Sequence, residues 1–460
     1  MFENVLGQDA VNRLIGDIEG GVLASAMLFS GPPASGKGTA ALELGRVISC
    51  EAGHEAGGGA DGAIGAAAWN SKAPWGCGCS ACSRHRLLIH PDLLCLGWKS
   101  FSAEISASAG AFLRDESAPV RMLFIRSVRK LLARFNPVLW DDEPKRTKIF
   151  PLAASLEEDL DELGFLSEKA DGNIRQLVEG MLKNAFKLES EGISETVPIN
   201  QIRRAAWWSR LAPAGRGKLL LIENADRMQE EARNSLLKLL EEPPGNLRCV
   251  LTTTRPGSLP STILSRLRPY RFNSRDASVE DEVIRRVFRD KPAPLSEPSS
   301  QDRIEAYLDS FLPVSNDTLE ALAAFFASSA AYKAALLCKR RGRAIPEEVV
   351  LLGQYSAPRA EVAGFGRPRA ETSAVIELIL EKAEKFEIRS LFTRFISCLL
   401  ENASRSLRQA PNPFLPSVSY NEIWSKTSLW AENAVRVYNL RPAQVLEKIF
   451  ADLSRGMAEL

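Results

Sequence analysis

The sequence has no excess of charge of either sign and few aromatic residues. Its 58 Lys and Arg residues are balanced by 57 Asp and Glu residues, a formal net charge of +1, and aromatic residues make up 7% of the chain. A neutral chain has no overall field to attract a polyanion, so contact with nucleic acid must come from a local basic patch or from partner subunits. Without alternating basic and aromatic residues, Trp207, Trp208, Trp424 and Trp430 are interpreted as packing residues rather than base-stacking platforms.

Long hydrophobic runs are also missing. No stretch approaches 18 uninterrupted apolar residues, and the first residues lack the basic segment and apolar core of a signal peptide. We therefore expect a cytoplasmic protein with no membrane contact. A length of 460 residues with 45% hydrophobic residues predicts two or three domains, each with its own core.

The eight cysteines are too few and too unevenly spread for the disulfide scaffold of a small secreted protein. Cys77, Cys79 and Cys82 fall close together, whereas others stand alone in apolar surroundings. An isolated buried thiol behaves as a small hydrophobic group. This is the expected role of Cys249, Cys338 and Cys398.

The order of elements predicts an α/β fold. A short apolar strand at 26–29 leads into a glycine-rich loop at 31–39 and then a helix. Continuous apolar runs at 218–222 and 249–254, with a helix between them, are typical of strands buried on both faces of a parallel sheet. The pattern indicates a doubly wound sheet whose ligands lie beyond the carboxyl ends of the strands.

Other segments interrupt or follow this pattern. Residues 51–76 are so rich in Ala and Gly that we expect a flexible insert, and residues 98–195 show the amphipathic period of an inserted helical subdomain. After Phe272 only helical patterns remain, separated by proline- and glycine-rich stretches at 291–294 and 354–369 that we interpret as linkers.

Residues 31–37, Gly-Pro-Pro-Ala-Ser-Gly-Lys, fit a phosphate loop, in which backbone N–H groups surround phosphates and Lys37 supplies a positive charge. The next residue is usually Ser or Thr, whose hydroxyl ligates magnesium. Here Gly38 takes that place and Thr39 follows. Two interpretations stay open: a loop that binds nucleotide, and a loop kept for structure alone.

The strand at 219–222 ends in Glu223 and Asn224, where a phosphate-loop ATPase carries the acids that hold magnesium and activate water. The neutral amide of Asn224 cannot accept a proton from water, so this position cannot act as a general base. Together with Gly38, it predicts a chain that does not hydrolyse ATP. We expect Asp226 to cap the following helix.

These segments and several others resemble the clamp-loader AAA+ subunits of bacterial DNA polymerase III, of the delta-prime and gamma/tau kind. Residues 1–95 and 196–272 carry the resemblance, and the helical segment between them lies outside it. Residues 439–447 resemble, more weakly, the helical collar through which such subunits form a ring. The matching motifs are 2–8, 26–31, 90–92, 198–203, 222–228, 234–244, 252–254 and 265–267.

The resemblance implies an AAA+ module at 1–272, a helical lid domain at 273–353 and an all-α collar domain at 370–460. It also implies a hetero-oligomer with gamma/tau and delta type subunits that loads a sliding clamp onto primed DNA, with Arg266 acting in trans as an arginine finger on a neighbour's ATP. The implied nucleotide-binding positions are Gly31, Gly36, Lys37, Gly38, Thr39, Glu223 and Thr254.

In this family, Cys50, Cys77, Cys79 and Cys82 would form a zinc site of four thiolates. The spacing differs, because 26 residues separate Cys50 from Cys77 and Cys77-Gly78-Cys79 is one residue short of a C-x-x-C step. A long loop adds little closure entropy. Free thiols remain an alternative, and His85 is a substitute ligand if Cys77 cannot reach the metal.

Parts of the sequence also suggest two other functions. A gamma/tau-type motor subunit would hydrolyse ATP, but it should carry a hydroxyl at position 38 and a carboxylate at 224. A nucleoside monophosphate kinase is suggested by 36–39, Gly-Lys-Gly-Thr, but does not explain the long helical C-terminal half. The basic run at 339–343 is either a solvated helix end or a contact to the DNA backbone.

Overall fold

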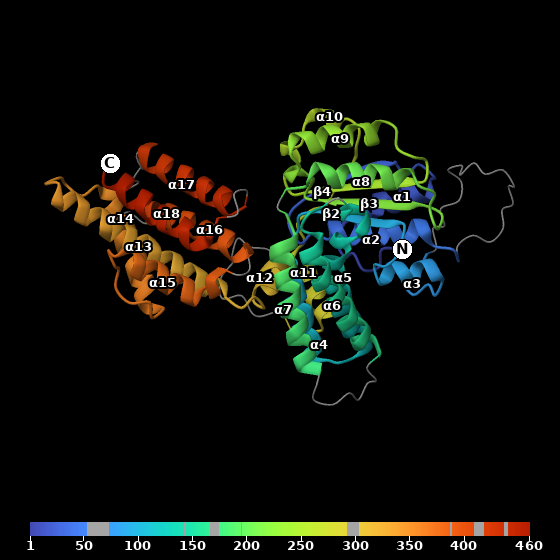
Figure 1. Ribbon diagram of the computed structural model, residues 1–460, viewed down its shortest axis with the longest axis horizontal. Coiled ribbons are helices and arrows are strands. Elements are labelled where there is room, and N and C mark those ends of the chain that lie inside the picture. The colour runs from blue at the N-terminus through green and yellow to red at the C-terminus, as the bar shows by residue number, and fades with distance from the viewer. Residues whose placement is uncertain are drawn as a thin grey trace. The chain divides into compact units, whose positions relative to one another are not determined.

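The structure is a computed structural model that describes residues 1–52, 73–141, 143–165, 174–194, 196–291, 303–386, 389–408, 418–436 and 440–460. It forms two compact units, Met1–Phe311 and Leu312–Leu460 (Figure 1). Most of the insert predicted at 51–76, and the linker predicted from 291 except its first residue, lie outside the described residues.

The first unit contains a five-stranded sheet in the order β2-β3-β4-β1-β5, and each strand is parallel to its neighbours. The predicted parallel sheet is therefore confirmed. Two of its strands were not singled out in the sequence, the edge strands β2 and β5. The strands are β1 (Ala26–Ser30), β2 (Leu93–Gly97), β3 (Lys218–Glu223), β4 (Leu247–Thr253) and β5 (Arg268–Arg271).

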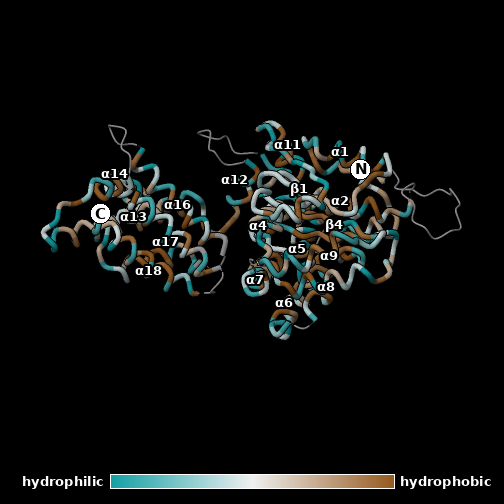
Figure 2. The backbone as a smooth tube through the Cα atoms, turned by 90° about the horizontal axis from the view of Figure 1, so that it is seen from above, coloured by the Kyte–Doolittle hydropathy of each residue, from teal (hydrophilic) through white to brown (hydrophobic). Residues whose placement is uncertain are grey.

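Alternate residues of each inner strand point into two separate hydrophobic cores, one on each face of the sheet. In β3, Leu219 and Leu221 belong to one core, whereas Leu220 and Ile222 belong to the other. A strand buried on both faces has no polar alternation, which is why its sequence is a continuous apolar run. Figure 2 shows hydrophobic residues gathered along the strands and the helices beside them.

Helices α1 and α2 pack on one face and α8 and α9 on the other (Figure 1). Between β2 and β3, the segment predicted as a helical insertion forms helices joined by short non-helical connections in its described residues, and its first 3-10 turn contacts β2. The elements outside the sheet are α1 (Asp9–Glu19), α2 (Lys37–Ser49), α3 (Ser80–Arg86), α4 (Ser102–Arg114), α5 (Ala118–Leu132), η1 (Ala133–Phe135), η2 (Pro137–Trp140), α6 (Arg146–Phe165), α7 (Ile174–Gly192), α8 (Ile199–Arg210), η3 (Ala225–Arg227), α9 (Glu230–Glu241), η4 (Pro256–Ser258), α10 (Ser261–Leu264), α11 (Ala277–Phe288) and α12 (Arg303–Asp309).

Helices are the only regular elements among the described residues of the second unit. Its central helix α13 packs against α14, α16 and α18, with Phe326 edge-on to Phe395 and Phe450 at 5.8 and 5.3 Å between ring centroids. The elements are α13 (Asn316–Arg340), α14 (Glu347–Val362), α15 (Thr372–Lys382), η5 (Glu384–Phe386), α16 (Arg389–Arg408), α17 (Val418–Arg436) and α18 (Pro442–Met457).

Helix α13 is apolar enough over its length to meet the criteria for a membrane span, and it alone does so among the described residues. In its most apolar window, 67% of the residues are buried inside the unit, as they are in the core helix of a globular domain. Its side chains therefore have protein partners on most sides.

The linker predicted at 354–369 is wrong in its first half, because α14 continues to Val362. Pro358 lies inside that helix, and a proline-based reading of the sequence ended the helix too early. The structure also groups α11 and α12 with the first unit and begins the second at Leu312. The division into module, lid and collar at 272, 353 and 370 stays a prediction.

Candidate functional site

The glycine-rich loop joins β1 to α2, where the sequence places a phosphate loop. Gly31 has a φ of +150°, and a Cβ there would lie 2.1 Å from the carbonyl oxygen of Phe272, so only glycine fits. The Lys37 ammonium donates hydrogen bonds to the Gly31 carbonyl at 2.8 Å, to Ser35 Oγ at 3.2 Å and to the Pro32 carbonyl. The lysine is thus folded back onto the loop's own acceptors.

Beside this loop, β3 ends at Glu223, and Asn224 follows it. Asn224 has a left-handed backbone with a φ of 50°, and its side-chain amide donates to the Trp98 carbonyl at 2.7 Å. Its backbone N–H donates to Thr252 Oγ1 at 3.2 Å. Asn224 is therefore held in place as a structural connection between β3, β4 and the residues after β2.

Glu223 pairs with an arginine from the helical segment. Arg134, in η1, donates to Glu223 Oε2, and the two side chains are 5% and 11% exposed. A second group of charges lies close by, since Glu104 accepts from Lys99 at 2.9 Å and from Lys130. Burial opposes ionisation of Glu104, but the two lysines outweigh it and hold the pKa of this carboxyl far below its usual value.

The end of β4 supplies further polar contacts. Thr253, which is fully buried, donates from Oγ1 to Asp226 Oδ1 at 2.6 Å and accepts from the N–H of Arg255 at 2.9 Å. Thr254, the predicted nucleotide-binding residue, follows the strand and is exposed. Asp226 was expected to cap a helix, and the structure gives it Thr253 as a hydrogen-bond partner.

Arg266 follows the short helix α10 and lies at the surface of the first unit. Its guanidinium pairs with Glu241, at the end of α9, at 2.7 Å and donates to the Thr262 carbonyl at 2.6 Å. The side chains of Arg266 and Glu241 are 33% and 49% exposed. A pair this exposed contributes little to stability and exchanges partners easily.

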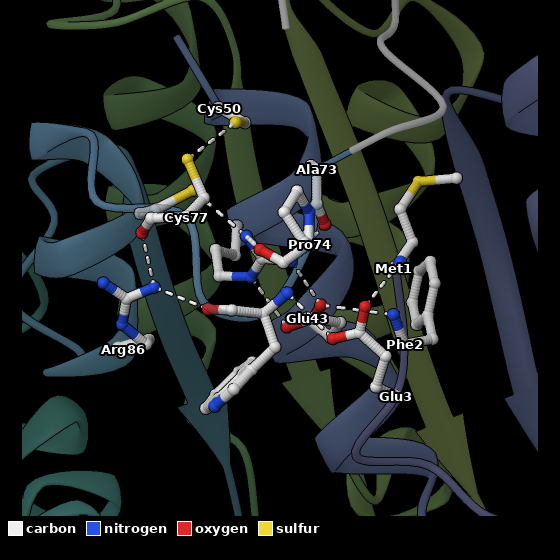
Figure 3. A network of polar contacts seen from close by, with 12 residues as sticks. Met1, Phe2, Glu3, Glu43, Cys50, Ala73, Pro74, Cys77 and Arg86 are labelled. Atoms are coloured by element: carbon white, nitrogen blue, oxygen red, sulfur yellow. Dashed lines mark hydrogen bonds and ion pairs between the residues drawn. The ribbon is translucent and has the colours of Figure 1, made fainter. Parts of the chain in front are cut away.

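The four predicted cysteine ligands converge. The Sγ atoms of Cys50, Cys77, Cys79 and Cys82 all lie within 4.8 Å of one another, and those of Cys50 and Cys77 are 3.7 Å apart (Figure 3). Zinc–sulfur bonds of about 2.3 Å in a tetrahedron place the sulfurs about 3.8 Å apart. The spacing therefore suits a tetrahedral metal with four thiolates, and the short Cys77-Gly78-Cys79 step does not prevent it.

The thiols of the cluster differ in acidity, and burial raises the pKa of Cys50 and of Cys82. Burial raises the pKa of Cys79, but hydrogen bonds from the backbone N–H groups of Cys82 and Glu51 outweigh it and lower the pKa to about 7. Arg46 donates to Cys82 Sγ at 3.1 Å and pairs with Glu43 at 2.6 Å. His85 is buried and stacks on His90 with ring centroids 4.2 Å apart, outside the group of four.

The loop that carries Cys77 is tied to the chain's first residues, as Figure 3 shows. Trp75 donates its backbone N–H to Glu3 at 2.8 Å, and Phe2 donates its own to Glu43 at 3.3 Å. Arg86 donates to the carbonyls of Trp75 and Cys77 at 2.6 and 2.7 Å. The cluster thus has a fixed position beside α2 and α3.

Comparison with known proteins shows what part of this chain resembles. Residues 156–276 match the family described as "DNA polymerase III, delta subunit". The delta' subunit of Pseudomonas aeruginosa is 32% identical over 118 residues, 25% of this chain and 36% of that protein. The delta' subunit of Bacillus subtilis is 41% identical over 114 residues, covering 24% and 34% of the two chains. The resemblance to the clamp-loader subunits of bacterial DNA polymerase III is confirmed.

The tau subunit of Escherichia coli belongs to the same set of relatives, with 31% identity over 105 residues, 23% of this chain and 16% of that protein. All three matches thus span well under two thirds of the relatives' length. A gamma subunit-related protein of Thermotoga maritima aligns over 66% of this chain and 91% of its own, at 17% identity and a TM-score of 0.25.

The clamp-loader match begins at residue 156, inside the helical segment 98–195 that was expected to lie outside the resemblance. The matching sequence motifs lie at 90–92 and 198–203, on either side of this segment. The helices between them contain no such motif, so the sequence gave no sign of similarity there. The resemblance therefore includes the C-terminal part of this segment.

The structure brings most of the predicted clamp-loader site together. Gly38, Thr39 and Glu223 line one small cavity, and the four cysteines form one group. Sequence reasoning missed the partners that come from the helical segment: Lys99, Glu104, Lys130 and Arg134. Arg134 is 89 residues from Glu223 along the chain, and no motif connects them.

Proposed function

We propose that this chain is a delta-prime-like subunit of a DNA polymerase III clamp loader. In that role it assembles with gamma/tau and delta type subunits and supports ATP-driven loading of the sliding clamp onto primed DNA, without hydrolysing ATP itself. The match to the delta subunit family and to two delta' relatives supports this proposal. Each of the two alignments covers about a quarter of this chain and about a third of the relative.

The observation that carries the proposal is the state of Asn224. Hydrolysis needs a group that takes a proton from the attacking water or orients it. The Asn224 amide donates instead to the Trp98 carbonyl, and its backbone is fixed by Thr252. Gly38 also lacks the hydroxyl that holds magnesium in phosphate-loop enzymes.

In this proposal Arg266 is the residue that acts on a partner. A guanidinium supplied to a neighbour's ATP neutralises charge on the transferring phosphoryl group, an effect of about 10³ to 10⁵ in rate in other systems. Arg266 lies at the surface and its partner Glu241 is half exposed, so the arginine can leave this pair for a phosphate at low cost.

The remaining parts take supporting roles. Four thiolates leave no open position on a tetrahedral metal, so zinc at the cysteine cluster would be structural. Residues 273–353 would form the lid and residues 370–460 the collar that holds the ring together. The run 339–343 at the end of α13 would be solvated, since its described residues are largely exposed.

The test is steady-state ATP hydrolysis by the complex rebuilt with its partner subunits, clamp and primed DNA. Arg266→Ala should leave assembly intact and lower the partner's ATPase by about 10³ or more, and Arg266→Lys should rescue poorly because it lacks the planar fork. Arg268→Ala is the matched control, since Arg268 is an exposed arginine two positions away that pairs with Asp17. Unchanged ATPase in an assembled Arg266→Ala complex would contradict the proposed role.

The gamma/tau alternative has its own signature, because tau and gamma subunits are also among the relatives. A motor subunit would turn over ATP on its own, and Lys37→Ala would abolish that turnover. Turnover of about 1 per second by the isolated chain, in the range of slow phosphoryl-transfer enzymes, would favour the motor.

A further inference from the structure

The helical segment before β3 supplies a fixed positive charge to the phosphate-loop site. Arg134 lies in η1 and reaches Glu223 at the carboxyl end of β3. Both side chains are almost completely buried, so this ion pair is desolvated and poorly screened by salt. Removing either partner would leave a buried charge without its counterion.

Arg134 is held in position by more than this pair. Its carbonyl accepts a hydrogen bond from Trp140 Nε1 at 2.8 Å, and its guanidinium lies over the Phe101 ring, 5.4 Å from the centroid. Both aromatic residues belong to the same helical segment or its entrance. Contacts within the segment therefore hold Arg134 in position before any ligand binds.

A phosphate-loop enzyme holds its divalent cation between two groups: an acid at the end of the strand that corresponds to β3, and the hydroxyl of the residue after the loop lysine. The Arg134–Glu223 pair occupies that place. One Glu223 oxygen accepts from Arg134. The other lies where a side chain at position 38 would begin, since a Cβ on Gly38 would be 2.7 Å from Glu223 Oε1. The residues present thus do not fit a magnesium ion.

Charge and space agree with this. The cavity lined by Gly38, Thr39, Lys99, Lys130, Arg134 and Glu223 has a volume of about 20 Å³, room for about one water molecule. Three cationic side chains, Lys99, Lys130 and Arg134, face two carboxylates, Glu104 and Glu223. A divalent cation entering here would meet a net positive surrounding, whereas a phosphate on the adjoining loop would be attracted by it.

We propose that Arg134 is a built-in substitute for the divalent cation: it neutralises Glu223 and closes the metal position, so that the loop binds nucleoside diphosphates and triphosphates without Mg²⁺. This deepens the proposal above and rests on it in one respect, the chain's lack of hydrolysis. It also gives the helical segment a role. The segment supplies a positive charge that a motor-type site obtains by binding Mg²⁺ from solution.

The test uses the full chain and a fluorescent ADP whose anisotropy reports binding, measured with excess Mg²⁺ and again with EDTA. The wild-type affinity should agree within about twofold between the two conditions. Arg134→Gln frees the Glu223 carboxylate, and Mg²⁺ should then tighten binding by about tenfold or more, since magnesium binds through carboxylates and phosphates together. Arg129→Gln is the matched control, because Arg129 pairs with Glu157 and Asp161 on the same segment away from the site.

Three results would overturn the proposal: tenfold tighter ADP binding by wild type with Mg²⁺, no ADP binding by wild type, or an Arg134→Gln variant that stays indifferent to Mg²⁺. Should that variant not fold, water-proton relaxation of Mn²⁺ decides on wild type alone. Added protein must leave the relaxation of Mn²⁺ with ADP unchanged, and an enhancement would mean that the metal position is open. None of these readouts depends on partner subunits or Arg266, so failure here and failure of the clamp-loader role are separate results.

Discussion

The cysteine cluster and the phosphate-loop site lie in the same unit, at opposite ends of helix α2, yet they depart from the family pattern in opposite ways. The cysteine spacing is irregular in the sequence, and the four sulfurs nevertheless converge to within 4.8 Å. The phosphate loop is nearly regular in the sequence, and its metal position is taken by Arg134. Regular spacing is therefore a poor guide to whether a site keeps its chemistry.

The difference follows from what each site needs. A four-thiolate site needs only that four sulfurs meet, and a loop of almost any length can close around it at small entropic cost. A magnesium site needs one hydroxyl, one carboxylate and an open space between them. Gly38 supplies no hydroxyl, and Arg134 both neutralises the carboxylate of Glu223 and fills the space beside it.

The largest expected effect comes from breaking the cysteine cluster. Cys50→Ala should remove the metal and lower the free energy of unfolding by several kcal/mol, because the binding energy of a structural zinc, about 10 kcal/mol or more in small peptides, is folding energy. Metal analysis should give one zinc per wild-type chain. Thermal unfolding with and without a chelator measures the loss.

Cys249→Ala is the matched control for that experiment. Cys249 is also a buried cysteine, but it lies in β4 outside the cluster, so its loss should leave the metal in place and cost on the order of 1 kcal/mol for a small cavity. Equal effects of the two substitutions, or a wild-type protein that folds and assembles without metal, would mean that the cluster is no longer a metal site.

A smaller effect is expected from the charges beside the phosphate loop. Glu104 has a folded-state pKa far below its unfolded value, so its pairing stabilises the protein above about pH 4.5 and this contribution is lost as pH falls below that value. Glu104→Gln should cost about 3 kcal/mol at pH 7 and clearly less at pH 3. Urea unfolding at the two pH values measures this, and Glu157→Gln, a more exposed acid on α6, is the control.

The two sites also differ in how far their residues could be predicted from the sequence. Apolar runs gave three of the sheet strands, because strands buried on both faces lack polar residues, whereas β5 exposes Arg268 and Arg271 at the sheet edge and carries Pro269. The cysteine ligands were identifiable because Cys77, Cys79 and Cys82 lie close together in the sequence and the family resemblance adds Cys50. Arg134 was not, since one arginine in a three-residue 3-10 turn has no local signal for a partner 89 residues away.

The smallest expected effect is a difference in the free energy of unfolding between two Gly→Ala variants, which should have opposite signs. Gly38 and Gly16 both lie in helices, and Gly→Ala in a helix ordinarily stabilises by about 0.5–1 kcal/mol. A Cβ on Gly16 meets nothing within 4 Å, so Gly16→Ala should follow that rule. A Cβ on Gly38 would lie 2.7 Å from Glu223 Oε1, and the carboxylate cannot easily retreat because Arg134 holds its other oxygen. Gly38→Ala should therefore destabilise by about 1–2 kcal/mol, measured by urea unfolding of both variants. In an Arg134→Gln background, where the carboxylate is released, the cost of Gly38→Ala should shrink, and a cost that stays the same would mean that Glu223 is positioned by something other than Arg134.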